Sequence, residues 1–227
     1  FAAAAPGRLA VTPEKLLLAI SGSQVVRIDP KTGESTVWIA TLEAPMGLAV
    51  ASDGRIAVAE WGKSQQVKLF DAKGKPIRTI GKPGGRAVRG AWEAEGFYKP
   101  LGLTFGPLGR LWVGEATHYP KRWSVWTLDG KLVKELFGPS HYGADGGALK
   151  PDDPYVGVGQ QCEWRVDPET GRETCLGVVS SKDQCNVPFP LMGAHSSRYV
   201  QAGGRWYLAQ GWHRYYSQLR VYRRTGD

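Results

Sequence analysis

The sequence predicts an all-β chain folded as a β-propeller of four-stranded blades, and three observations lead to this fold class. A motif with a period of about 40 to 45 residues recurs along the chain, as propeller blades do. Short β-rich runs alternate with turns among 30 Gly and 15 Pro in 227 residues, which is typical of many short strands. No segment shows apolar residues at helical spacing with caps.

The repeat is clearest in two neighbouring units. The first reads P-M-G-L-A-V at 45–50, D-G-R-I-A-V-A-E at 53–60 and V-K-L-F-D at 67–71, and it closes on Ile80 and Gly81. The second repeats this order as P-L-G-L-T-F at 100–105, L-G-R-L-W-V-G-E at 108–115 and V-W-T-L-D-G at 125–130, closing on Phe137 and Gly138. Two units with the same internal order predict the same supersecondary structure twice.

Three weaker units complete the set, and the last of them stops before a fourth strand. Turns such as D-G, G-G and D-P-x-T-G supply the positive φ angles or Asx turns that join neighbouring strands. We expect an N-terminal tail at 1–7 and blades at about 8–42, 45–81, 100–138, 146–180 and 195–227. Because an unfinished blade leaves an open edge, we expect these five blades to belong to a ring of six to eight.

The order P-x-G-L-A-V, D-G-R-I-x-V-A-E, V-x-L-F-D-x-x-G and I-G resembles the NHL repeat over nearly the whole chain. Within that class the chain is most similar to bacterial NHL-like proteins with a long loop between blades, here 82–99. The resemblance implies a propeller but no single function, because such propellers serve as binding platforms, lyases and lactonase-like hydrolases. It also implies that Glu60 and Glu115 bond neighbouring backbone or a basic residue. The first unit departs from the pattern, with Ile20 in the place of this Glu.

The charge is basic but spread along the chain. The net charge is +8 and the pI is near 9.4, and a basic surface speeds the encounter with acidic polymers. No stacking motif of the RNA-recognition type is present, so we favour a protein or polysaccharide partner over nucleic acid. The longest apolar run, Leu16 to Ile20, is too short to span a bilayer.

The cysteines and the first residues bear on the compartment. Cys162 and Cys175 flank the turn at 167–171, so a disulfide between them is a candidate in an oxidising compartment. Unreactive thiols in a reduced protein are the equal alternative. Residues 1–7 resemble the small-residue tail of a signal peptide, which favours an extracellular or periplasmic location without excluding the cytoplasm.

Polar and aromatic groups recur at one end of the predicted blades. Alignment of the units places Glu60, Glu115 and Gln210 at one equivalent position, the end of the second strand, and His195 where other units have proline. The predicted binding face comprises Glu60, Trp61, Glu115, His118, Tyr119, His195, Gln210, Trp212, His213, Arg214 and Tyr215. Tyr, Trp and Arg are the residue types enriched at interaction hot spots.

The same ring of side chains has the chemistry of a metal site. Carboxylates and imidazoles suit Zn²⁺, and carboxylate oxygens suit Ca²⁺. The metal candidates are Glu60, Glu115, His118, His195 and His213. The alternative is that both glutamates serve only internal bonding, and we assign no catalytic residue. The sequence contains no nucleophile elbow, P-loop, dinucleotide cradle or H-E-x-x-H motif.

The leading expectation is a non-enzymatic binding or scaffold module that presents one loop face to a protein or a polysaccharide. Two alternatives stay open. One is a metal-dependent hydrolase or lyase that uses Ca²⁺ or Zn²⁺ at the propeller axis. The other is a structural subunit of an extracellular, multimeric assembly.

Overall fold

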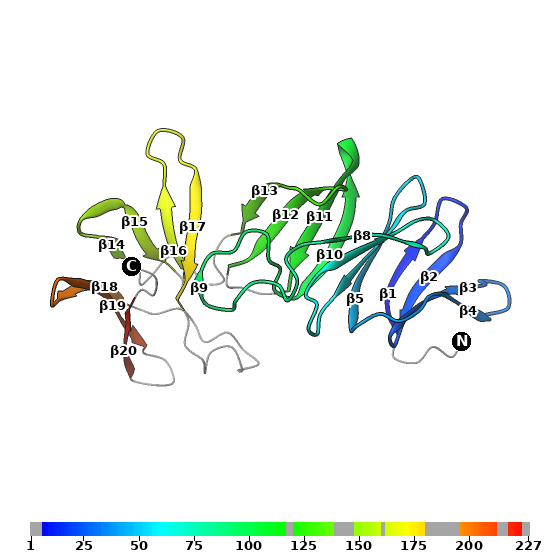
Figure 1. The fold of residues 1–227 in the computed structure, drawn as a ribbon, viewed down its shortest axis with the longest axis horizontal. Helices are drawn as coiled ribbons and strands as arrows, with labels where there is room; N and C mark the ends of the chain where they lie inside the picture. Colours follow the sequence, from blue (N-terminus) through cyan, green and yellow to red (C-terminus); the bar gives the residue numbers. More distant parts are fainter. Residues whose placement is uncertain are drawn as a thin grey trace. The chain divides into compact units, whose positions relative to one another are not determined.

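The computed structural model describes residues 6–116, 120–138, 148–159, 162–179, 196–212 and 218–223. Within these ranges the chain forms 20 β-strands and one 3-10 turn, Pro107–Gly109, but no α-helix (Figure 1). The all-β prediction is therefore confirmed. No helix in the described ranges has the length and apolar character needed to cross a bilayer. The chain divides into two compact units, one built on residues 1–86, 94–117 and 122–137 and the other on 87–93, 118–121 and 138–227.

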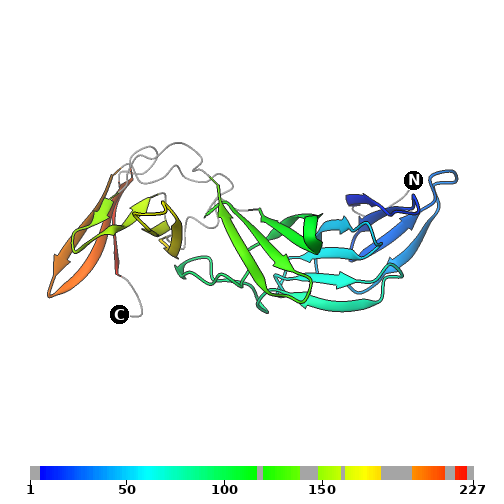
Figure 2. The same cartoon turned by 90° about the horizontal axis from the view of Figure 1, so that it is seen from above.

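The first unit contains three four-stranded antiparallel sheets, each with its strands in sequence order, which is the topology of a propeller blade. The first blade comprises β1 (Pro6–Val11), β2 (Leu17–Ser21), β3 (Gln24–Ile28) and β4 (Ser35–Ile39). The second comprises β5 (Pro45–Val50), β6 (Ile56–Glu60), β7 (Val67–Phe70) and β8 (Pro76–Ile80). The third comprises β10 (Pro100–Gly106), β11 (Arg110–Glu115), β12 (Arg122–Thr127) and β13 (Leu132–Phe137). The innermost strands β1, β5 and β10 lie side by side (Figure 1 and Figure 2).

The second unit contains two sheets. One comprises β14 (Ala148–Lys150), β15 (Asp153–Gly159), β16 (Cys162–Val166) and β17 (Glu173–Val178), with β9 (Gly90–Ala91) added to its outer edge. The other comprises β18 (Ser196–Ala202), β19 (Arg205–Trp212) and β20 (Gln218–Arg223). The described sheets thus number five, in agreement with the predicted count of about five blades, while the ring of six to eight stays a prediction.

The added strand β9 comes from the long loop at 82–99, and the sequence did not predict it. Ala91 pairs with Gly177 and Gly90 with Val178, and the Trp92 N–H donates to the Leu176 carbonyl at 3.0 Å. A Cβ on Gly177 would lie 2.8 Å from the Gly90 carbonyl oxygen, so glycine permits this approach. Backbone groups alone make the pairing of β9 with β17, so no pattern of side chains in the sequence predicts this pairing.

Alternating apolar residues build the core between the blades of the first unit. Leu18, Ile20 and Val25 of the first blade pack with Ile56 and Phe70 of the second. The opposite face of the second blade packs on the third in a cluster of Ala57, Ala59, Val67, Leu69, Ile80, Phe97, Leu111, Val113 and Trp126. Because successive side chains of a strand point to opposite faces, the second blade serves both interfaces. Each fully buried Leu, Ile or Val stabilises the fold by about 1.5 to 3 kcal/mol.

The disulfide between Cys162 and Cys175, one of the two equal alternatives, is not formed in the structure. Cys162 lies opposite Val178 and Cys175 opposite Trp164, no S–S bond joins the two cysteines, and the Cys175 thiol donates to the Gly177 carbonyl at 3.8 Å. The strand register explains this separation. The hairpin pairs Cys175 with Trp164, and a bulge between Glu163 and Trp164 then places Cys162 opposite Val178. Cys185 lies outside the described residues.

Candidate functional site

One end of the first unit brings together the turns after β2, β6 and β11 and the starts of the innermost strands, because neighbouring strands are antiparallel. Pro45 lies opposite Glu60 and Pro100 opposite Glu115, so the two glutamates occupy equivalent positions. In the first blade Pro6 lies opposite Ser21. The expectation that Ile20 takes the place of this Glu is therefore wrong. All three blades carry the same register shift near this proline, and the difference lies in β2, where Leu17 rather than Leu16 occupies the position of Ile56.

The Glu60 carboxylate is fully buried and bonded on both oxygens. Its Oε1 accepts the Glu43 N–H at 2.8 Å, and its Oε2 accepts the Ser64 hydroxyl at 3.2 Å. Lys68 Nζ lies 3.0 Å from Oε1 and 2.9 Å from Oε2, and its side chain is 32% exposed. Glu60 therefore ties the segment before β5 to the turn after β6, with a lysine at the border of solvent as its counter-charge.

Glu115 is satisfied in a different way, by two arginines. Arg86 Nη2 lies 2.7 Å from Oε2 and Arg122 Nη1 lies 2.7 Å from Oε1, and the three side chains are 1%, 0% and 0% exposed for Arg86, Arg122 and Glu115. Arg122 Nε lies 2.8 Å from Glu135 Oε1. Two carboxylates thus offset two guanidinium charges, as buried charges require.

The same arginine fixes the long loop on the third blade. Arg122 Nη1 donates to the Gly96 carbonyl at 2.9 Å, and Nη2 donates to the Ala94 carbonyl. Phe97 is fully buried against Trp126, with ring centroids 5.1 Å apart. Charge-assisted donors and an aromatic contact therefore hold residues 94–97, which directly precede Tyr98 and Lys99.

An aromatic and cationic cluster, Trp61, Tyr98 and Lys99, lies half-buried beside this network. The Trp61 Nε1–H donates to the Pro100 carbonyl at 2.7 Å. Lys99 Nζ lies 5.4 Å from the centroid of the Trp61 ring and 5.6 Å from that of Tyr98, within cation–π range. Arg86 approaches the Tyr98 ring at 5.5 Å. The sequence predicted Trp61 but not Tyr98 or Lys99, although the aromatic-basic pair before Pro100 was a signal.

The backbone at this end adopts left-handed conformations that side chains usually avoid. Thr41, Ala44, Gln65 and Lys99 have φ angles of 60°, 46°, 47° and 54°. The carbonyls of Ala44 and Lys99, each before a proline, accept the N–H groups of Trp61 at 3.0 Å and Ala116 at 2.9 Å. Such conformations cost about 1 to 3 kcal/mol each, persist only where surrounding contacts fix them, and cluster at functional sites.

Only two of the five predicted metal ligands, Glu60 and Glu115, lie among the residues that the structure describes. His118, His195 and His213 lie outside the described residues, as do Tyr119, Arg214 and Tyr215. Gln210 pairs with Ser197 and Arg220 through its backbone, and Trp212 pairs with Gln218, but the side chains of Gln210 and Trp212 are not described. Among described residues no three His, Cys, Asp or Glu side chains are grouped as metal ligands would be. To bind a metal ion, the carboxylates of Glu60 and Glu115 would have to give up the hydrogen bonds and ion pairs that they make within the protein.

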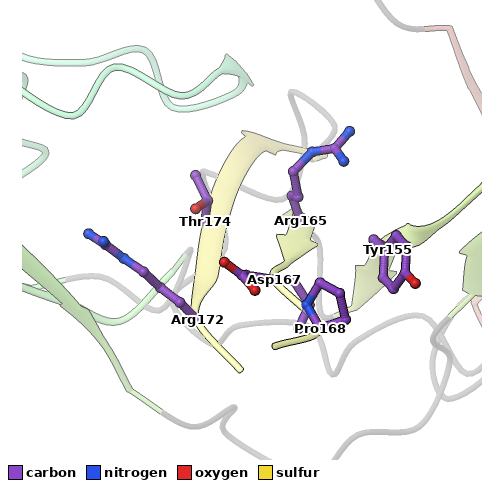
Figure 3. Close-up of a pocket in the computed structure, with 7 residues that line it drawn as sticks. Tyr155, Arg165, Asp167, Pro168, Arg172 and Thr174 are labelled. Atoms are coloured by element: carbon purple, nitrogen blue, oxygen red, sulfur yellow. The ribbon is translucent and has the colours of Figure 1, made fainter. Parts of the chain in front are cut away.

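A hollow of about 360 Å³ lies on the second unit, lined by Tyr155, Arg165, Val166, Asp167, Pro168, Arg172 and Thr174. Asp167 serves its own turn, where the N–H groups of Thr170 and Glu169 donate to it and hold its pKa below the ordinary value. Arg165 pairs with Asp153 at 2.7 Å. Arg165 and Arg172 extend in different directions (Figure 3), so the hollow lacks the convergent polar groups of a ligand site.

No known family matches this sequence, and no curated protein matches it. Among solved structures the chain is similar to virginiamycin B lyase from Staphylococcus aureus, at 17% identity over 99% of this chain and 72% of that one, with a TM-score of 0.46. It is also similar to a gluconolactonase from Xanthomonas campestris, at 14% identity over 92% and 84% of the chains (TM-score 0.46). A chain of a nidogen/laminin complex matches at 14% identity over 92% and 73% (TM-score 0.43). These low values support no inference about activity, ligand or partner.

Proposed function

We propose that this chain is a non-enzymatic binding module that holds an acidic polysaccharide or an acidic protein segment on the Trp61, Tyr98 and Lys99 cluster. The observation that carries the proposal is the fixed, half-exposed arrangement of two aromatic rings around one lysine ammonium group. Aromatic side chains bury much area at little entropic cost, and rigid side chains lose less freedom on binding.

Charge supports an acidic partner. Two carboxylates beside the cluster, Glu60 and Glu115, are buried and paired with cations, so they do not dominate the surface potential there. A third, the exposed Glu43, accepts the N–H groups of Lys63 and Ser64 in the turn after Trp61. The net charge of +8 adds a long-range attraction for polyanions that weakens with salt. The site therefore combines flat apolar rings, which stack on sugars or apolar side chains, with a cation for a carboxylate.

Binding of polygalacturonate and polyglutamate, measured by calorimetry with dextran as the neutral control, tests the proposal. We expect Lys99→Gln to weaken binding of the preferred polyanion about tenfold, the equivalent of about 1.4 kcal/mol. Lys131→Gln, in the β12–β13 turn where the lysine side chain is 81% exposed, is the matched control and keeps its affinity. Equal losses in the two variants, or no binding of either polyanion by the wild type, would contradict the proposal.

A further inference from the structure

The charge of the aromatic and cationic cluster is carried by Lys99, whose ammonium group makes no ion pair with any described residue. Its Nζ lies 5.4 Å and 5.6 Å from the centroids of the Trp61 and Tyr98 rings, whereas the nearby Lys68 and Arg86 are paired with buried carboxylates. An ammonium group has three N–H donors, and contact with two rings leaves donors for an anion from outside the chain.

Hydrogen bonds fix this cluster before any ligand binds. The Lys99 N–H donates to Gln65 Oε1 at 2.6 Å, and Gln65 Nε2 donates to the Gly62 carbonyl at 3.1 Å. This amide bridge joins the lysine to the turn after the tryptophan. The Trp61 Nε1–H donates to the Pro100 carbonyl at 2.7 Å. Because the indole has no other donor, the accessible part of the Trp61 ring offers only apolar surface beside the cation.

This combination favours an acidic sugar over an acidic peptide. In a uronate the carboxylate is attached directly to the pyranose ring, so an apolar C–H face and a charge lie at a fixed separation. The carboxylate of a glutamate side chain instead ends a chain of rotatable bonds, and immobilising such a side chain costs conformational entropy. A uronate therefore uses the prearranged rings and ammonium group at a smaller entropic cost.

The charges around the cluster favour one carboxylate per sugar over a densely sulfated chain. Arginine is the side chain that binds oxyanions with two parallel hydrogen bonds, but Arg86 and Arg122 are buried against Glu115. The exposed Glu43 carboxylate is bonded to the backbone of the turn after Trp61, and it repels further anionic groups that come near. A chain with widely spaced single charges avoids most of this repulsion.

We propose that the ligand of the cluster is a polyuronate, a polysaccharide that packs a pyranose C–H face on the Trp61 and Tyr98 rings and pairs a carboxylate with Lys99. This inference rests on the proposed function, because it names the ligand class of the same cluster. The rings supply apolar contact and the ammonium group neutralises the charge. A polyuronate uses both contributions, whereas an acidic peptide uses mainly the second.

Calorimetry with four polymers at equal concentrations of monomer units tests the inference. They are polygalacturonate, its fully methyl-esterified form, polyglutamate and dextran sulfate. We expect polygalacturonate to bind about tenfold more tightly than each of the other three. Methyl esterification keeps the sugar ring and removes the charge, while polyglutamate keeps the charge and removes the ring.

Two variants separate the ring contribution from the charge. Tyr98→Leu should weaken polygalacturonate binding about fivefold and leave polyglutamate binding unchanged, because only the sugar uses the ring. Lys99→Gln should weaken the binding of both polyanions. Tyr155→Leu, at a tyrosine of β15 that is 48% exposed, is the matched control and should change neither affinity. Thermal unfolding of the three variants confirms that each is folded.

Two results would overturn the inference and leave the proposed function standing. One is polyglutamate or dextran sulfate that binds as tightly as polygalacturonate. The other is a Tyr98→Leu variant whose affinities for polygalacturonate and polyglutamate change by the same factor. If neither of these two polyanions binds, or if the methyl-esterified polymer binds as tightly as polygalacturonate, the proposed function fails together with the inference.

Discussion

Glu60 and Glu115 occupy the same position of neighbouring blades, yet the chain satisfies them by different means. Glu60 bonds a backbone N–H, a hydroxyl and a lysine that reaches solvent. Glu115 bonds two arginines that are almost fully buried. The difference follows from the loops, because the second blade is preceded by a short connection and the third by the long loop that supplies Arg86. A repeated residue can therefore keep its place in the blade while the cost of removing it changes from one blade to the next.

The largest expected effect is that of Glu115→Ala. Removal of the carboxylate leaves Arg86 and Arg122 buried with one neutralising partner fewer, so we expect a loss of about 3 to 5 kcal/mol in unfolding free energy. Glu60→Ala should cost less, about 1 to 3 kcal/mol, because Lys68 can turn into water and mainly a backbone N–H loses its partner. Urea unfolding of both variants measures the difference. Equal losses of unfolding free energy in the two variants would contradict the expectation that the buried arginines make removal of Glu115 more costly.

A smaller effect of opposite sign is expected at the strained residue before each proline. Ala44→Gly should raise the unfolding free energy by about 0.5 to 1 kcal/mol, because glycine relieves the left-handed backbone of Ala44 at more than its entropic cost. Lys99 has the same conformation in the equivalent position. As a control, Ala57→Gly in the buried strand β6 should be destabilising. A destabilised Ala44→Gly would show that the Ala44 side chain matters more than its backbone strain.

The smallest effect concerns an exposed ion pair, the counterpart of the two buried carboxylates. The Arg55 guanidinium donates to Asp53 at 2.8 Å and holds the pKa of that carboxyl below its ordinary value. A carboxyl with a lowered folded pKa stabilises the fold above its unfolded pKa, near 4, and this contribution disappears as the pH falls. Because both side chains are more than a third exposed, Asp53→Asn should cost under about 1 kcal/mol at pH 7.

Unfolding of the wild type and Asp53→Asn at pH 7 and pH 3 measures that contribution. The difference between the two proteins should be largest at pH 7 and smaller at pH 3, because the contribution of a carboxyl with a lowered folded pKa is lost as the pH falls below its unfolded pKa. A difference that grows toward low pH would have the wrong sign for a lowered pKa and would contradict the assigned cause.

The sequence by itself determined the fold class and the two equivalent glutamates. Both depend on local information, since strand alternation, turn residues and a repeated order are readable from neighbours along the chain. The same information located Trp61 after Glu60. It misplaced the first blade by one residue, at Ile20 instead of Ser21, because the run of three leucines at 16–18 does not mark which leucine occupies the position of Ile56.

Only the tertiary structure decided what these residues contact. Arg86, Tyr98 and Lys99 come from a loop without strand periodicity, and their approach to Glu115 and Trp61 spans many residues. The pairing of β9 with β17 uses backbone groups alone, and the separation of Cys162 from Cys175 depends on register. Side-chain type predicts which residues can bond, but the partner is chosen by backbone geometry and loop closure, which no local pattern encodes.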